Sequence, residues 1–216
     1  MAHLMNMTKS RTRCWLLLAV LAALHGCSTT PTSSFYALNA RADSPLPGTE
    51  GPVCPNAVIS VGPVVLPALL LRPQIVTREN ANRLKFNEFH RWGGQLDADV
   101  HTVLMRNLSM LLATDQVVPY LDADKHKVSF RVEVNIEQFD GQLDGAATLM
   151  ASWTLTDLRT ERRVNIKRAE ITTPIAAPHY DDLVAAQSAA VAAFSVQIAQ
   201  EIALLCGASR AVARID

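Results

Sequence analysis

Aromatic residues, an excess of either charge and long apolar runs are all scarce in this 216-residue sequence. Aromatics make up 6% of the residues although hydrophobic residues make up 49%, so Ala, Val and Leu must fill most of the core. Lys and Arg number 20, Asp and Glu also number 20, and the formal net charge is zero. A nucleic-acid-binding protein needs a basic surface, so we exclude that class. The length suits roughly one domain.

Sequence motifs of the common enzyme classes are also absent. The chain contains no G-x-S-x-G, no H-E-x-x-H and no glycine-rich phosphate loop. His90 and His101 lie eleven residues apart, a spacing that does not suit a shared metal ion. We therefore expect no enzymatic activity, no cofactor and no metal site. A hydrolase that uses His90 or His101 is kept as an alternative.

The longest apolar run is short and lies near the N-terminus. Residues 14–24 read CWLLLAVLAAL, and Lys9, Arg11 and Arg13 precede them with no acidic residue. Eleven helical residues span about 16 Å, whereas the hydrocarbon core of a bilayer is roughly 30 Å thick. Such a run with a basic flank is typical of a secretion signal. We predict that residues 1–26 are a cleaved signal peptide, which leaves 17 basic and 20 acidic residues, a net charge of −3.

The apolar run ends in LHGC, residues 24–27, which resembles the lipobox of bacterial lipoproteins. Leu24 and Gly26 match the pattern, and His25 stands where a small residue is usual. In such proteins the cysteine becomes the N-terminus and carries three acyl chains, more than the two signals that stable anchoring needs. Ser28 is not Asp, which implies sorting to the outer membrane. We expect Cys27 to be lipidated; an ordinary secretory signal cut nearby is the alternative.

Polar and Pro/Gly-rich stretches follow Cys27. Residues 28–34 and 40–56 are predicted to be tether and loop, with FYAL (35–38) between them as a short strand. We assign residues 27–56 to the lipidated cysteine, the tether and this strand, residues 57–207 to the folded domain, and residues 208–216 to a C-terminal tail. A tether of about 30 residues would span roughly 30 Å as a random coil.

Two helical stripes and several alternating runs predict an α+β fold. Apolar residues recur with helical period over 96–112 and 180–206, each with acidic residues in the first turn, and Gly207 is expected to end the second helix. The predicted strands are 57–66, interrupted at Gly62-Pro63, a hairpin of 74–79 and 83–89, and a meander of 127–138, 146–157 and 163–172. We predict an antiparallel β-sheet with the two long α-helices packed on one face.

Cys54 and Cys206 remain once Cys14 leaves with the signal and Cys27 is acylated. An oxidising compartment permits a disulfide between them. Such a bond would close a loop of about 150 residues and contribute up to roughly 4–5 kcal/mol in the chain-entropy model. Two separate thiols, one of them packed in the core, are the alternative.

Several segments together resemble the PqiC/YmbA-like family, the ABC-type transport auxiliary lipoprotein component. The resemblance runs from Cys27 to about Leu205 and is carried by SSFYAL, by residues 59–96, by LMRNLSMLLATDQVVPY, by FDGQLDGAATLMASWTL and by residues 180–203. Its most specific part is RPQIVTR followed by RLKFNEFHRW.

The resemblance implies a non-catalytic lipoprotein on the periplasmic face of the outer membrane of a Gram-negative cell. Such proteins cooperate with an inner-membrane-anchored MCE-domain protein to move lipids between the two membranes, and family members are similar to ring-forming homo-oligomers. A structural or assembly lipoprotein of the envelope without lipid traffic is the alternative function.

The segments around the predicted hairpin hold the candidate contacts with a partner or a sister subunit. The density of polar and aromatic residues in NEFHRWGG exceeds what a connection needs. A simpler reading is that Trp92 anchors a loop beside helix 96–112, with an ion pair at its edge. The candidate contact residues are Arg72, Gln74, Arg78, Glu88, Arg91 and Trp92.

Overall fold

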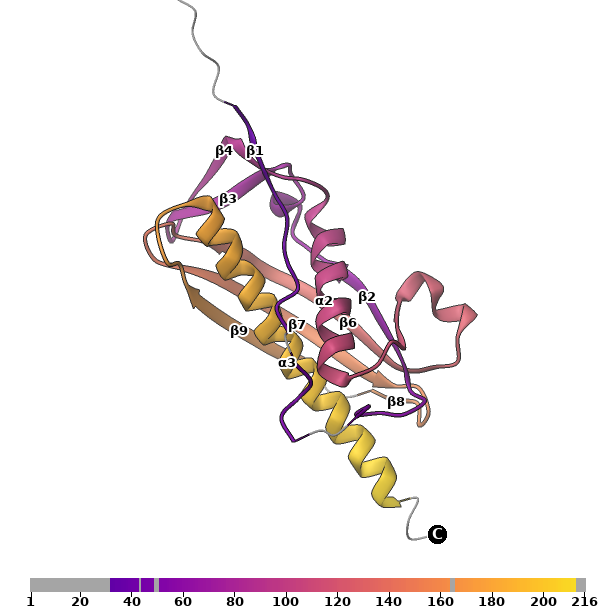
Figure 1. Cartoon of the computed structure of the whole chain (residues 1–216). Coiled ribbons are helices and arrows are strands. Elements are labelled where there is room, and N and C mark those ends of the chain that lie inside the picture. Colours follow the sequence, from indigo (N-terminus) through magenta and orange to yellow (C-terminus); the bar gives the residue numbers. More distant parts are fainter. Residues whose placement is uncertain (1–31, 43, 49–50, 164–165, 213–216) are drawn as a thin grey trace, which may run out of the picture. The chain divides into compact units, whose positions relative to one another are not determined.

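The computed structural model describes residues 32–42, 44–48, 51–163 and 166–212, and their strands form two sheets (Figure 1). The signal peptide and Cys27 lie outside the described residues. The strands are β1 (Ser34–Tyr36), β2 (Val58–Val65), β3 (Gln74–Asn80), β4 (Arg83–Trp92), β5 (Val117–Pro119), β6 (Val128–Gly141), β7 (Ala146–Asp157), β8 (Arg162–Arg163) and β9 (Lys167–Pro174). The helices are α2 (Leu96–Leu112) and α3 (Tyr180–Val212), with short 3-10 turns η1 (Ala68–Leu70) and η2 (Tyr120–Lys125).

The larger sheet has the order β5-β2-β6-β7, and both β8 and β9 pair with β7. The antiparallel meander β6-β7-β9 is as predicted. Strand β2 runs parallel to both β5 and β6, so the sheet is mixed rather than wholly antiparallel. A parallel pair needs a long crossover, and here α2 lies between β2 and β6 in the chain.

Alternation of apolar and polar residues positions the centre of this sheet. Every second residue of β7 from Ala147 to Asp157 is buried, and Phe130, Val132 and Val134 of β6 are buried on the same side. The pairing of β6 with β7 shifts between Ile136 and Gln138, which is why Phe139 takes the next core position.

The smaller sheet has the order β1-β4-β3. Strands β3 and β4 form the predicted antiparallel hairpin, but β4 continues to Trp92. Strand β1 lies parallel to the end of β4, with Phe35 opposite Arg91 and Tyr36 opposite Trp92. The start of the described chain is therefore fixed to the hairpin, and we call this three-stranded unit the small sheet.

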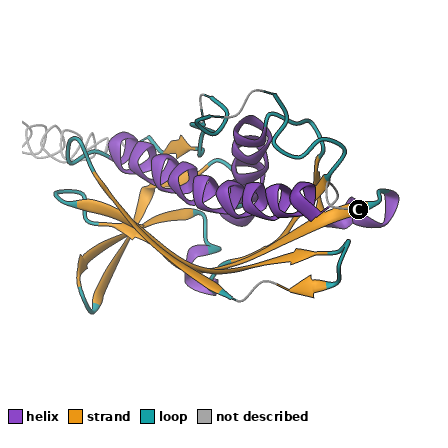
Figure 2. Ribbon diagram, turned by 90° about the horizontal axis from the view of Figure 1, so that it is seen from below, coloured by secondary structure: helices purple, strands orange, loops and turns teal. Residues whose placement is uncertain are grey.

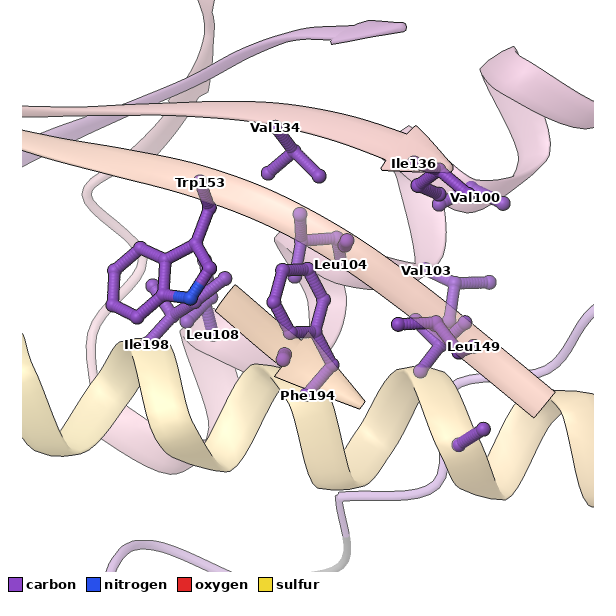
Figure 3. Close-up of a cluster of buried hydrophobic side chains, with 14 of the residues drawn as sticks. Val100, Val103, Leu104, Leu108, Val134, Ile136, Leu149, Trp153, Phe194 and Ile198 are labelled. Carbon is purple, nitrogen blue, oxygen red and sulfur yellow. The ribbon is translucent and has the colours of Figure 1, made fainter. Parts of the chain in front are cut away.

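Both long helices cover one face of the larger sheet, which confirms the predicted α+β class (Figure 2). Figure 3 shows Phe194 of α3 directed toward Trp153 of β7, and their rings meet edge to face with centroids 6.3 Å apart. Residues Tyr180–Gly207 are long and apolar enough to cross a membrane, yet α3 packs on β7, β9 and α2. Within the described residues, this helix is part of the core.

Two boundaries differ from those predicted. Helix α3 does not end at Gly207 but runs to Val212, because a helical glycine costs only about 1 kcal/mol and Ala-rich sequence follows it. The tether is also shorter than predicted, because residues after β1 bind the helices. The backbone amide of Leu38 donates to Asp99 Oδ2 at 2.9 Å, and that of Val53 donates to the Leu112 carbonyl at 3.0 Å.

Candidate functional site

A bidentate ion pair between Arg78 and Asp140 joins the small sheet to the larger sheet. Arg78 of β3 donates through Nε and Nη2 to the two carboxylate oxygens of Asp140 on β6, at 3.1 and 2.7 Å. Asp140 is buried and also accepts from Gln138 Nε2 at 2.8 Å. The hydrogen bond to Asp140 raises the pKa of Arg78 above its ordinary value. Arg78, a predicted contact residue, is thus held by an internal partner.

A ring cluster joins the small sheet to the start of α3. The hydroxyl of Tyr36 lies 2.6 Å from His90 Nδ1, and the His90 ring stacks on Tyr180 with centroids 3.9 Å apart. Burial raises the pKa of Tyr36 above its ordinary value. Because Tyr36, His90 and Tyr180 come from β1, β4 and α3, the cluster fixes three elements to one another.

The remaining predicted contact residues divide between core and surface. Trp92 is 5% exposed, and its amide donates to the Pro73 carbonyl at 2.7 Å, so its side chain belongs to the core and offers no surface to a partner. Gln74 Nε2 donates to both carboxylate oxygens of Glu88 at 3.1 Å. The Arg72 guanidinium lies 4.2 Å from the centre of the Phe86 ring.

Arg91 is half-buried, and its Nε is a buried nitrogen without a hydrogen-bond partner among the described residues. The simpler reading predicted an ion pair beside Trp92. On the small sheet, the contact that Glu88 makes with Gln74 is an amide–carboxylate hydrogen bond and not an ion pair. Four of the predicted contact residues lie on the small sheet or on the segment that leads into it: Arg72, Gln74, Glu88 and Arg91.

The two histidines of the hydrolase alternative lie on different elements. His90 is in the ring cluster, whereas His101 of α2 donates through Nε2 to the Val61 carbonyl at 3.0 Å. Each has a structural contact, and no group of three or more His, Cys, Asp or Glu in the described residues could hold a metal ion. The geometry therefore brings together no catalytic set from the predicted residues.

A disulfide joins Cys54 to Cys206, with Cα atoms 5.8 Å apart. It fixes the loop that precedes β2 to the C-terminal part of α3, across 152 residues of sequence. Both cysteines are buried. An apolar groove of about 730 Å³ lies nearby, lined in part by Leu46, Pro47 and Leu204.

Asn107, which the sequence patterns did not single out, organises the segment after β1. Asn107 is 0% exposed on α2, and its Oδ1 accepts from the backbone amides of Arg41 and Ala42 at 3.0 and 3.2 Å. Its Nδ2 donates to Ser195 Oγ of α3 at 3.2 Å. A lone Asn on the apolar side of a predicted helix, in LMRNLSMLL, was the available signal.

These features define a disulfide-linked α+β domain with two helices on one face and a small sheet fixed to the start of the chain. The sequence model of the family described as "ABC-type transport auxiliary lipoprotein component" matches residues 36–199. The chain belongs to this family, as the resemblance predicted. Comparison with curated protein sequences gives no match.

Solved structures share the fold. A crystal structure titled as that of an uncharacterized protein has a TM-score of 0.63 at 22% identity, covering 79% of this chain and 99% of the other. Protein XCC0632 from Xanthomonas campestris, of the DUF330 family, has a TM-score of 0.64 at 14% identity, covering 82% of this chain and 99% of the other. At these identities the similarity shows the fold alone.

Proposed function

We propose that this protein is an outer-membrane-anchored periplasmic lipoprotein and a non-catalytic accessory subunit of an MCE-protein lipid transport system. The observation that carries the proposal is the family match over residues 36–199, which begins nine residues after Cys27 of the lipobox-like LHGC. Cys27 is the proposed lipid anchor. The subunits act as a homo-oligomeric ring, in keeping with the family resemblance.

A binding role suits the described residues better than a hydrolytic one. The alternative required His90 or His101 to act as a base, yet His90 stacks on Tyr180 and His101 donates to a backbone carbonyl. The protein would instead hold a partner near the outer membrane, and confinement to a membrane surface raises the effective concentration of its subunits.

Crosslinking in living cells tests this function. A photo-reactive amino acid is placed at exposed positions on different elements, such as Glu88 on β4, Leu121 on η2 and Leu204 on α3. We expect at least one position to capture an MCE-domain protein. Capture of peptidoglycan-bound proteins alone from every position would contradict the proposal.

A deletion strain separates the proposal from a structural lipoprotein without lipid traffic. Loss of a transport subunit is expected to change the lipid composition of the outer membrane and to lower resistance to detergent. Unchanged composition and unchanged resistance would favour the structural alternative. Complementation with a Cys27→Ser chain is expected to fail, because the anchor is then absent.

A further inference from the structure

Exposed large apolar side chains concentrate on the small sheet and on the segment that leads into it. The described residues include eleven such side chains, and five of them lie in β1, in β4, in η1 or between η1 and β3. We call these five, together with the neighbouring Arg72 and Arg91, the anchor-end surface. The five apolar members are Phe35, Leu69, Leu71, Phe86 and Phe89.

Pairing and ring contacts link the members of this surface. Phe35, which is 67% exposed, lies opposite Arg91 in the parallel pair of β1 and β4. The Arg72 guanidinium lies over the Phe86 ring, and Leu71 is its neighbour in the chain. Apolar and cationic groups are therefore neighbours on one small unit, which is the combination that membrane-surface elements present to phospholipids.

The start of the described chain places this surface close to the proposed anchor. Thr32 is the fifth residue after Cys27, and a fully extended chain covers at most about 18 Å over that length. Strand β1 begins two residues later and is hydrogen-bonded to β4. Figure 1 shows β1, β3 and β4 at the end of the domain where the described chain begins. An acylated Cys27 would thus keep the small sheet beside the leaflet.

Charge favours the same orientation. Residues 68–92 carry five basic and two acidic side chains, and one of the five, Arg78, is paired with Asp140. The chain from Cys27 onward has 17 basic and 20 acidic residues. A local positive excess on an acidic protein is attracted to anionic phospholipids.

We propose that the anchor-end surface lies on the phospholipid leaflet that holds the acylated Cys27, with its Phe and Leu side chains in the headgroup region. This inference rests on the proposed lipidation. Arg72 and Arg91, which the sequence suggested as contacts with a protein partner, then face lipid. The small sheet sets the orientation of the whole domain, because the Arg78–Asp140 pair fixes it to the larger sheet.

Fluorescence quenching by brominated phospholipids tests this orientation. Leu71→Cys and Phe89→Cys, made in the full chain and purified from membranes, are labelled with an environment-sensitive dye. Leu121→Cys is the matched control, because Leu121 is 75% exposed and lies outside the small sheet. It follows β5 of the larger sheet, whose Pro119 pairs with Val61 midway along β2. The proteins are inserted into vesicles of phosphatidylethanolamine and phosphatidylglycerol, and intact mass confirms the acyl chains of each sample.

The dyes at positions 71 and 89 are expected to lose at least about half of their fluorescence to the lipid bromines, and the dye at 121 to lose little. Equal quenching at all three positions in an acylated protein would overturn the orientation and leave the proposed anchor intact. A mass without acyl chains would overturn the anchor itself. The dyes at positions 71 and 89 could instead be shielded from solvent in the absence of vesicles, with a shielding that increases with protein concentration. A second copy of the protein would then cover the surface, and this result would also overturn the proposal.

Discussion

Removal of the Asn107 side chain should loosen the segment that follows β1. Asn107→Ala deletes the acceptor of the Arg41 and Ala42 amides and the donor to Ser195. Each of these three hydrogen bonds contributes about 1 kcal/mol net, and buried groups left without partners cost more. We expect the free energy of unfolding to fall by about 3 kcal/mol.

Thermal unfolding measures this loss. For a chain of this size 1 kcal/mol corresponds to about 2–4 °C, so Tm should fall by about 9 °C. Asn135→Ala is the matched control, because Asn135 is exposed and its side chain makes a weak hydrogen bond, Nδ2 to Ser152 Oγ at 3.5 Å. Its free energy of unfolding should change by less than about 0.5 kcal/mol.

Hydrogen exchange adds a local readout. The amides of Arg41 and Ala42 should exchange faster in Asn107→Ala, because their acceptor is gone. If Asn107→Ala unfolds at the same temperature as Asn135→Ala and both amides stay protected, the reasoning is refuted, because other groups must then bind this segment.

Three further predictions concern the disulfide, the ion pair and pH. Reduction of the disulfide should lower the free energy of unfolding by up to about 4–5 kcal/mol, and an unchanged Tm in reductant would show that the bond does not form in solution. Arg78→Met should destabilise the protein by about 3 kcal/mol, because Asp140 stays buried without its ion-pair partner. Arg78→Lys should restore little of this stability, because a lysine cannot bind both carboxylate oxygens. Full restoration by lysine would argue against the bidentate geometry. The hydrogen bond from Arg159 lowers the pKa of Asp157, so its stabilisation is present above about pH 4 and is lost as the pH falls through the lower folded pKa. Asp157→Asn should therefore show a smaller fall in Tm than wild type between neutral and strongly acidic pH, and parallel curves would contradict this assignment.

The periodicity of apolar residues predicted the helices and strands in which that periodicity is uninterrupted. Helix α2 spans the predicted residues 96–112, and β7 spans the predicted 146–157. In both cases an uninterrupted period matches one buried face. The end of β6 was predicted three residues too early because the shift after Ile136 breaks the alternation before Phe139.

Pairings between distant segments could not be predicted from local patterns. Nothing in residues 58–65 indicates that β2 joins β6 in parallel, because that register depends on the crossover through α2. The segment after β1 looked like a tether because its sequence is polar and rich in Pro and Gly. Its backbone amides bind partners on distant helices, such as Asp99 and Asn107 of α2. The predicted contact residues lie together around the small sheet, but the burial of Trp92 depends on the tertiary packing.

The native mass of the protein, purified in detergent from bacterial membranes, decides whether the proposed lipid anchor exists. We predict an oligomer of chains that begin at Cys27, each heavier than the unmodified polypeptide by a diacylglycerol and one further acyl chain. An unacylated chain, or one whose N-terminus lies elsewhere, would contradict both the lipid anchor and the role that depends on it.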